Sequence, residues 1–168
     1  MNNVQIFDEL AAEYDQWFDE HPLAYQSELQ ALRRYIPAKG KGIEIGVGSG
    51  KFAKPLGIAV GIEPAEGMAE LAKQRGIKVF KATAEDLPFR DETHDFVLFV
   101  TTLCFVDNPW RSLREAHRIL KPSGSIIIGM IDRDSPRGQA YFSMKKESPF
   151  YQYAQSYSAR EVLQLVRC

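Results

Sequence analysis

Cysteine, net charge and long apolar segments are all scarce in this sequence. Its two cysteines, Cys104 and Cys168, form no C-x-x-C pair, so they indicate a reducing compartment and argue against a disulfide framework. The 21 basic and 22 acidic side chains leave a formal charge of −1, which lacks the electrostatic footprint of a protein that binds nucleic acid or an anionic membrane. The longest nearly uncharged run, residues 96–106, is too short to cross a bilayer of roughly 30 Å as a helix.

The sequence also lacks internal repeats, low-complexity segments and an N-terminal targeting pattern. Its first ten residues carry Asp8 and Glu9 and no apolar centre, unlike a signal or transit peptide. The three histidines, His21, His94 and His117, share no ligand spacing, so no metal site is predicted. From these absences we expect a cytoplasmic protein, monomeric or weakly dimeric, with no nucleic-acid or membrane partner.

What the sequence does contain is typical of one soluble globular domain. The chain has 168 residues, of which 45% are apolar and 26% are charged. A domain of this length buries roughly 70% of the surface that its unfolded chain exposes, so its core needs no disulfide or metal. We therefore predict a single domain over residues 1–168.

Helical and strand-like segments alternate along the chain. Two amphipathic helices are expected first, over residues 7–18 and 25–36. The expected strands are 43–47, 58–62, 77–81, 95–100 and 125–131, and the helices between and after them are 51–54, 65–75, 108–120 and 158–167. This alternation predicts an α/β fold, a Rossmann-like doubly wound and mainly parallel sheet with helices on both faces.

The turn after the first expected strand is rich in glycine. Residues 44–50 read E-I-G-V-G-S-G, with Gly46, Gly48 and Gly50 at alternate positions. Glycine tolerates positive φ and lets the backbone approach a ligand closely. Because this turn lies at the carboxyl end of a strand, it stands where doubly wound folds bind ligands.

Two common nucleotide motifs fail on spacing. A phosphate-binding P-loop needs glycine at position 45 and Ser or Thr at position 52, but these are Ile45 and Phe52. A dinucleotide G-x-G-x-x-G counted from Gly46 needs glycine at position 51, which is Lys51.

Glu63 ends the second expected strand, 17 positions after Gly46. A carboxylate there can accept two hydrogen bonds from a ribose diol, each contributing roughly 1.5–3 kcal/mol. The alternative is a helix N-terminal charge, since Glu63 and Glu66 flank Pro64 where a helix begins. The glycine turn upstream favours the ribose interpretation.

Four stretches in register carry a resemblance to a known family. They are IEIGVGSG (43–50), GIEPAEGM (61–68), ATAEDLPFRDETHDFV (82–97) and LREAHRILKPSGSIII (113–128). With them the sequence resembles the class I S-adenosylmethionine-dependent methyltransferases, in particular the small-molecule group similar to ubiquinone and menaquinone biosynthesis methyltransferases. The resemblance implies S-adenosyl-L-methionine as cofactor and methyl transfer to a small-molecule acceptor by in-line displacement.

The resemblance also implies a set of cofactor-binding residues. In order along the cofactor, these are Glu44, Gly46, Gly48 and Gly50 at the methionine part, Glu63 at the ribose, Pro64, Met68, Ala84 and Glu85 at the adenine, Thr101 and Thr102 near the methionine and the substrate entrance, and Tyr14 closing the site. It further implies an N-terminal helical lid over residues 1–38 and a cofactor-binding core over 39–135. The aromatic, loop-like stretch 137–157 leads us to expect a substrate-cover loop and a last helix over 136–168.

The sequence departs from the family at several places. The family often has Asp at the position of Thr83, and many relatives carry His in the segment that here reads Thr101-Thr102-Leu103-Cys104. The helix after the glycine turn is short and contains Pro55. We expect the C-terminal strand hairpin of the family to be missing from this chain.

No catalytic residue is assigned. In-line displacement needs chiefly alignment, and a general base is required only for a protonated nucleophile. The segment after the fourth strand has no proline, unlike the Pro-Pro motif of nucleic-acid and protein-amide N-methyltransferases. Two alternatives stay open. The first is an S-adenosylmethionine-binding protein without turnover. The second is an NAD-dependent oxidoreductase, although Lys51 at the third glycine position of the dinucleotide motif counts against it.

Overall fold

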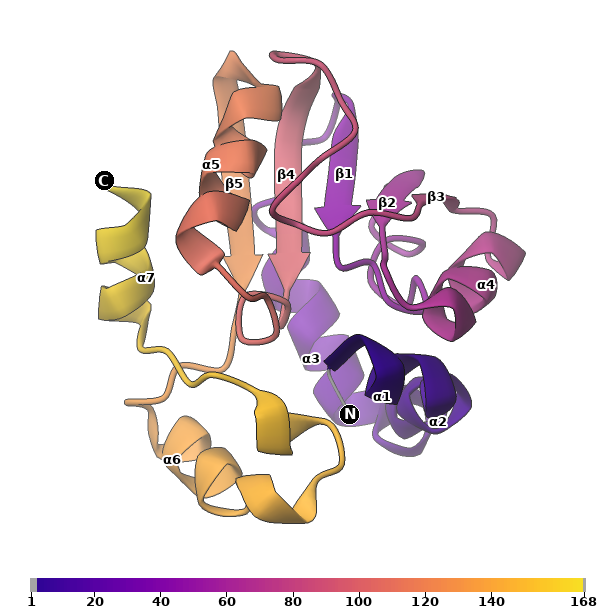
Figure 1. Cartoon of the computed structure of the whole chain (residues 1–168), viewed down its shortest axis with the longest axis vertical. Coiled ribbons are helices and arrows are strands. Elements are labelled where there is room, and N and C mark those ends of the chain that lie inside the picture. The colour runs from indigo at the N-terminus through magenta and orange to yellow at the C-terminus, as the bar shows by residue number, and fades with distance from the viewer. Residues whose placement is uncertain (1–2, 168) are drawn as a thin grey trace.

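A computed structural model describes residues 3–167 and shows a five-stranded sheet at the centre of the molecule (Figure 1). The strands are β1 (Gly42–Ile45), β2 (Val60–Ile62), β3 (Lys78–Phe80), β4 (His94–Val100) and β5 (Leu120–Gly129). Their order is β3-β2-β1-β4-β5, and every neighbouring pair is parallel. The chain reverses direction of travel across the sheet between β3 and β4, so the predicted doubly wound α/β fold is confirmed.

Side chains of β4 alternate between two cores because successive residues of a strand point to opposite faces. Val97 and Phe99 pack with α5 (Pro109–Ile119) on one face. Phe96 and Leu98 pack with Leu29 and Leu32 of α3 (Pro22–Arg33) on the other. The strand is therefore covered by helices on both sides, as its continuous apolar run predicts.

The first expected helix is two helices instead of one. α1 (Asn3–Glu9) and α2 (Ala11–Glu20) are separated at Leu10, whose φ of −109° and ψ of 28° leave the helical range. α1 is held by contacts of its own, because Asn3 and Asp8 bond to two other parts of the chain. These tertiary contacts override a periodicity that runs through Leu10 without a break.

The short helix expected over residues 51–54 is absent, and the segment is a series of turns. Gly50 and Gly57 bracket it with left-handed backbones, at φ of 82° and 74°. Pro55 supplies no N–H to continue a helix. The expectation of a helix there was wrong because too few residues remain between these breaks.

The stretch 137–157, expected as a loop, begins with a helix and contains two single 3₁₀ turns. α6 (Pro136–Ser143) starts after Ser135, whose hydroxyl accepts a hydrogen bond from the Gly138 N–H at 2.9 Å. The 3₁₀ turns are Lys145–Glu147 and Tyr151–Tyr153. Ser followed by Pro at the first helical position is a known start signal that the aromatic content obscured.

The remaining elements lie close to their expected places. α4 spans Glu66–Gln74, and α7 spans Ala159–Val166 behind a Ser158–Glu161 capping box. β5 begins earlier than expected, because Leu120 directly follows α5 and pairs with His94. Figure 1 shows α1, α2 and α6 gathered beyond the carboxyl ends of β1, β4 and β5. Cys104 carries a free thiol, while Cys168 lies outside the described residues.

Candidate functional site

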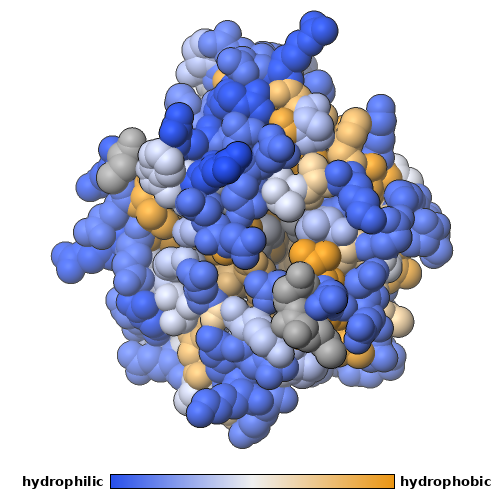
Figure 2. Space-filling view, viewed as in Figure 1, coloured by the Kyte–Doolittle hydropathy of each residue, from blue (hydrophilic) through white to orange (hydrophobic). Residues whose placement is uncertain are grey.

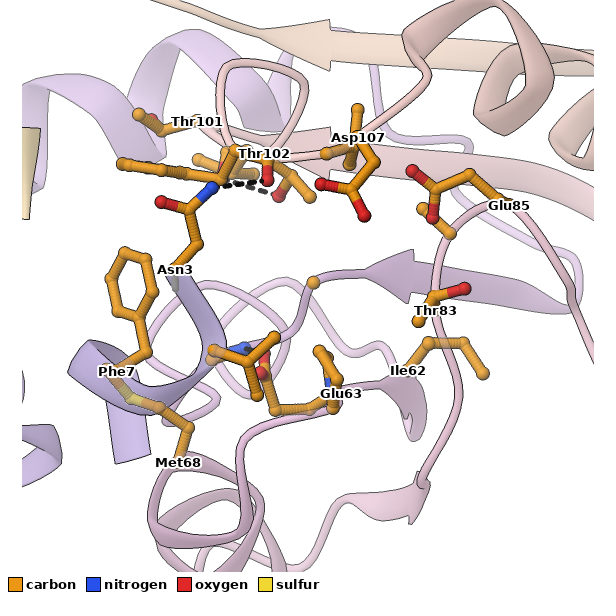
Figure 3. A pocket seen from close by; sticks show the side chains of 18 of the residues that line it. Asn3, Phe7, Ile62, Glu63, Met68, Thr83, Glu85, Thr101, Thr102 and Asp107 are labelled. Atoms are coloured by element: carbon orange, nitrogen blue, oxygen red, sulfur yellow. Dashed lines mark hydrogen bonds between the residues drawn. The ribbon is translucent and has the colours of Figure 1, made fainter. Parts of the chain in front are cut away.

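A cavity of about 380 Å³ opens at the carboxyl ends of the strands (Figure 3). Ten of the twelve predicted cofactor residues line it: Tyr14, Gly46, Gly48, Glu63, Pro64, Met68, Ala84, Glu85, Thr101 and Thr102. They come from five separate segments of the sequence, four of which follow strands of the parallel sheet, while Tyr14 comes from α2. The cavity has the size of an ordinary small-molecule site.

Gly46 and Gly48 shape the wall under the cavity. Gly46 has a φ of 69°, and a Cβ on it would lie 2.4 Å from the Thr102 Cγ2 atom. Thr102 is fixed there because its Oγ1 donates to the Ile45 and Val100 carbonyl oxygens, both at 3.1 Å. Gly48, at φ 53°, has open space where a Cβ would stand. This space is what a cofactor needs to lie directly on the backbone.

Glu63 connects the glycine turn to the end of β2. Its Oε2 accepts a hydrogen bond from the Gly48 N–H at 2.9 Å, and its Oε1 accepts one from the Ala65 N–H at 3.0 Å. The side chain is 7% exposed, and burial raises its pKa from 4.5 to about 7. Each carboxylate oxygen keeps a second lone pair for a hydroxyl donor from the cavity.

Two predicted residues, Glu44 and Gly50, lie behind the wall instead of lining the cavity. Glu44 is 1% exposed, accepts a backbone hydrogen bond from Ala53, and has a pKa well above its ordinary value because of burial. Its Oε2 atom has no partner among the described residues. Gly50 makes room for helix α4, since a Cβ there would meet Ala72 at 3.3 Å. Both residues support the turn from behind and lie outside the cavity lining, and their predicted contact with the cofactor stays a prediction.

Glu85 has a structural partner. Its Oε1 accepts a hydrogen bond from the Asn108 N–H at 3.0 Å, and its carbonyl oxygen accepts one from Arg111 Nε at 3.0 Å. Asn108 is the N-cap of α5. The carboxylate therefore fixes the start of α5 against the loop after β3.

Thr101 adopts an unusual backbone at the end of β4. Its φ is 52°, a strained value for a β-branched residue, and its N–H donates to the Gly129 carbonyl oxygen at 2.8 Å. The turn redirects the chain across the mouth of the cavity, which brings Phe105, Val106 and Asp107 to its rim.

The N-terminal helices cover the cavity. The Asn3 Nδ2 atom donates to the Phe105 carbonyl oxygen at 2.9 Å, and the rings of Phe7 and Phe105 lie 4.9 Å apart. Phe7 also meets the edge of the Tyr14 ring at 5.4 Å. Burial raises the pKa of the Tyr14 hydroxyl far above its usual range. Tyr14 lines the cavity, and its predicted role in closing the site stays a prediction.

Two further contacts hold these helices down. Asp8 accepts a hydrogen bond from the Gly67 N–H at 2.6 Å, in the first turn of α4. Asp15 pairs with Arg75 at 2.7 Å, and Arg75 also donates to the Ser49 carbonyl oxygen at 2.7 Å. Arg75 thus links α2 to the glycine turn.

Several lining residues were not predicted from the sequence, among them Asn3, Phe7, Phe105, Asp107 and Tyr153. Asp107 carried a usable signal, because it follows a buried parallel strand as Thr101 and Thr102 do. The others are aromatic or polar residues whose places depend on how α1 and residues 151–153 pack over the sheet.

The cavity is acidic. Glu63, Glu85 and Asp107 line it, and the described lining residues include no Lys, Arg or His. The three carboxylates would repel the negative charge of a pyrophosphate, and no basic side chain is there to neutralise it. The same carboxylates attract a cationic ligand. Between residues 3 and 167, no group of three or more His, Cys, Asp or Glu side chains could hold a metal.

A second, much smaller cavity of about 20 Å³ lies behind Thr101 and Thr102. Cys104 and the aromatic residues Phe142, Tyr151 and Tyr157 line it, and none of its described lining residues is an acid, Lys, Arg or His. Burial raises the pKa of the Cys104 thiol to about 12. Both cavities share the two threonines, so the threonines stand between the acidic site and an uncharged one.

A family model described as a methyltransferase domain matches residues 43–128. The chain belongs to this family. It is a class I S-adenosylmethionine-dependent methyltransferase, and its fold and its cofactor, S-adenosyl-L-methionine, agree with the expectation from the four sequence stretches.

Relatives and solved structures agree with this assignment. The methyltransferase superimposes with a TM-score of 0.94 on the crystal structure of a Thermotoga maritima methyltransferase, named as a possible histamine N-methyltransferase, at 51% identity over 97% of this chain and 78% of that one. An uncharacterised protein of Methanocaldococcus jannaschii is 51% identical over 98% of this chain and 80% of its own length. A ubiquinone/menaquinone biosynthesis C-methyltransferase of Geotalea daltonii is 27% identical over 79% of this chain and 63% of its own length. The chain thus spans less than two thirds of that last relative.

The residues of the methyltransferase fit S-adenosylmethionine. The open backbone at Gly48, the lone pairs of Glu63 and the acidic lining suit a cationic nucleoside with a ribose diol. They fit the pyrophosphate of NAD poorly. In the described part of the chain, no helix is both long and apolar enough to cross a membrane.

Proposed function

We propose that this methyltransferase transfers the methyl group of S-adenosylmethionine to a small-molecule acceptor by in-line displacement. The observation that carries the proposal is the acidic cavity of about 380 Å³, which is lined by the open backbone at Gly48 and by the Glu63 carboxylate. When bound, the cofactor supplies an electrophilic sulfonium methyl group.

In this proposal the larger cavity holds the cofactor. Gly46 and Gly48 support its methionine part, Glu63 accepts from its ribose hydroxyls, and Pro64, Met68 and Ala84 contact its adenine ring. Glu44 and Gly50 act from behind the wall, the former through Ala53 and the latter through α4. No predicted side chain needs to react.

The smaller cavity marks the proposed acceptor side of the site. At about 20 Å³ it has room for about one water molecule, so an acceptor must displace the side chains that surround it. Its lining is aromatic and uncharged, and residues 136–168 supply Phe142, Tyr151 and Tyr157 to it. Burying an unpaired charge there would be costly, so a neutral ring compound suits it best. The names of the Thermotoga and Geotalea relatives, a possible histamine N-methyltransferase and a ubiquinone/menaquinone biosynthesis C-methyltransferase, both support a small acceptor.

The chain's own residues contribute alignment and exclusion of water. Residues 1–38 form the lid, the core is 39–135, and 136–168 cover the acceptor. Holding two reactants in line supplies roughly 7–11 kcal/mol of barrier reduction, and the raised pKa values of Tyr14 and Cys104 keep both groups neutral beside the methyl path.

A thermal-melt titration with S-adenosylmethionine, S-adenosylhomocysteine and NAD tests the cofactor half of the proposal. A ligand at about 100 times its dissociation constant adds about 2.7 kcal/mol, which raises the Tm by roughly 5–10 °C in a domain of this size. We expect a shift with the two sulfur compounds alone. A shift with NAD alone would contradict the proposal.

Release of labelled methyl to a panel of acceptors tests the other half. The panel pairs neutral ring compounds with carboxylated and quaternary ammonium analogues of the same rings. We expect methylated product from the neutral members only. The control is Gly48→Ala, whose added methyl group occupies the cofactor's space and should lower the yield of every product. Cofactor binding without transfer to any panel member would leave a binding protein and contradict the proposed turnover.

A further inference from the structure

We propose that Asn3 positions the methyl acceptor, its amide oxygen accepting a hydrogen bond from the N–H group of a neutral ring amine whose lone pair faces the cofactor's methyl group. The inference rests on the proposed function and deepens it, because it names the class of acceptor. Asn3 lines the larger cavity, and the sequence motifs did not identify it.

The Asn3 amide oxygen is a buried acceptor that lacks a donor. Its Oδ1 atom is shielded from solvent and makes no hydrogen bond within the part of the chain that the structure describes. Native structures rarely leave a buried acceptor unsatisfied, because the atom gives up its hydrogen bonds to water and gains none in return. A donor on a ligand in the cavity would complete this bond.

A second contact fixes the direction of the amide. The Asn3 Nδ2 atom donates to the Phe105 carbonyl oxygen at 2.9 Å. Only the NH₂ group of an amide can donate to a carbonyl oxygen, so the side chain cannot turn over without losing this bond. Figure 3 shows the amide oxygen on the side of Thr101 and Phe7, away from Asp107.

The end of the cavity at Asn3 adjoins the proposed acceptor side. The Phe105 N–H donates to the Thr102 carbonyl oxygen at 2.9 Å, and Thr102 lines both cavities. The rings of Phe105 and Tyr151 lie 5.5 Å apart, and Tyr151 lines the smaller cavity. Through Phe105, Asn3 is therefore placed to contact an acceptor that enters from that side.

The groups near the two threonines favour an amine over a hydroxyl compound. An O–H nucleophile must lose its proton during the transfer, which requires a base. Burial raises the pKa of Cys104 to about 12 and that of Tyr14 far above its usual range, so neither is ionised near neutrality. An amide oxygen can orient an N–H group, but it takes up no proton at neutral pH.

A neutral amine needs no base for the transfer itself. Its lone pair forms the new C–N bond, while the C–S bond breaks and leaves its electron pair on sulfur. The N–H proton stays on nitrogen during this step, so Asn3 can hold it throughout. The ammonium product then releases a proton to water.

The acceptor reaches Asn3 only when the cover of the cavity gives way. The Oδ1 atom is buried in the free protein, whereas Val4 and Tyr153, which also line the cavity, are 37% and 42% exposed. We expect the acceptor to displace part of this exposed rim.

The test measures labelled methyl transfer at pH 7.5 to aniline, N-methylaniline, N,N-dimethylaniline and phenol. The three amines are neutral at this pH, and the first two carry an N–H group. We expect the wild type to prefer the N–H amines over N,N-dimethylaniline and phenol by about tenfold in kcat/KM, since a hydrogen bond is made and a buried acceptor is satisfied.

Variants of Asn3 separate this role from attachment of α1. Asn3→Leu and Asn3→Ala should methylate N-methylaniline and N,N-dimethylaniline nearly equally, and should still bind S-adenosylhomocysteine in calorimetry. Asp8→Ala is the matched control, because it removes the other hydrogen bond that attaches α1, from the Gly67 N–H. This control should keep the wild-type preference even where its overall rate falls.

Every outcome decides the proposal. An unchanged preference in the Asn3 variants overturns it, as does an equal loss in Asp8→Ala or a loss of S-adenosylhomocysteine binding in both Asn3 variants. A wild type that methylates none of the three amines, or prefers phenol, overturns it as well. The proposed function survives those last two results if another neutral ring compound is methylated, and it fails if none is.

Discussion

Gly46 and Gly48 both adopt left-handed backbones, but they have different neighbours. The space beside Gly46 is filled by Thr102, whereas that beside Gly48 is open. Gly46 is therefore required for the packing of the folded chain, whereas Gly48 leaves space for the cofactor.

Substitution by alanine makes this difference measurable. Gly46→Ala combines a left-handed alanine with a 2.4 Å approach to Thr102, and we expect it to lower the free energy of unfolding by about 2–4 kcal/mol. Gly48→Ala should cost only about 1–2 kcal/mol but weaken S-adenosylhomocysteine binding at least tenfold, because its methyl group occupies the cofactor's space. Urea denaturation and calorimetry measure the two effects. Equal losses of stability in both variants would contradict this assignment.

Glu63 should make cofactor binding depend on pH. Its pKa of about 7 leaves it half protonated near neutrality in the free protein, and a protonated carboxyl loses acceptor capacity for the ribose hydroxyls. We expect the affinity for S-adenosylhomocysteine to rise from pH 5.5 to 7.5 and then level off. Glu63→Gln should bind more weakly at pH 7.5 and show a flatter profile. An unchanged slope in this variant would assign the titration to another group.

Local spacing was enough to predict Glu63 and the glycine turn, because both lie at the ends of adjacent strands. Position along the chain was not enough for Glu44 and Gly50. Glu44 is buried beside Ala53 and Gly50 contacts α4, and both contacts depend on how the chain packs. Asp107 and Asn3 were missed because their places follow from the Thr101 turn and from the contact of α1 with Phe105.

At the scale of elements, α2 is held by the buried Phe18 side chain and by ion pairs from two of its aspartates. Asp15 is 15% exposed and pairs with Arg75 at 2.7 Å and with Lys51 at 3.9 Å, while Asp19, 68% exposed, pairs with Lys51 alone among the described residues. An ion pair partly removed from solvent contributes more than an exposed one. The first pair also reaches the glycine turn through Ser49.

Breaking the Asp15 pair should loosen the cover of the cavity. We expect Asp15→Asn to lower the free energy of unfolding by about 1 kcal/mol and to speed S-adenosylhomocysteine dissociation by about fivefold. Asp19→Asn is the control and should change both quantities little. Stopped-flow displacement gives the rate, and equal rates in the two variants would contradict the role of the Asp15–Arg75 pair.

The sequence predicted the type of an element correctly where a single pattern, such as a continuous apolar run, was strong. The buried run of β4 and a helix over residues 108–120 were predicted. The break at Leu10 and helix α6 were not, because the first depends on tertiary contacts and the second on a Ser-Pro start within an aromatic stretch.

At the scale of the whole molecule, Glu63 should make the free energy of unfolding fall as the pH rises, whereas the affinity for the cofactor rises. Its folded-state pKa lies above the value of 4.5 for the unfolded chain, so the folded protein binds the proton more tightly. The free energy of unfolding should fall as the pH rises from about 4.5 to 7, by about 3 kcal/mol from this group. Denaturation profiles of the wild type and Glu63→Gln, without ligand, should diverge over that window. Parallel profiles would contradict burial as the cause.

The face shown in Figure 2 is largely hydrophilic, with hydrophobic side chains in small groups. The expected cytoplasmic location, monomeric or weakly dimeric state and absence of a nucleic-acid partner stay predictions.

The acidic lining of the cavity has a consequence for the end of each reaction cycle. S-adenosylmethionine carries a sulfonium charge, and donation of its methyl group leaves a thioether with one positive charge fewer. Glu63, Glu85 and Asp107, with no Lys, Arg or His among the described lining residues, attract the reactant form more than the spent form. We therefore expect the cavity to bind S-adenosylhomocysteine less tightly than S-adenosylmethionine. Fresh cofactor can then displace the product after each methyl transfer.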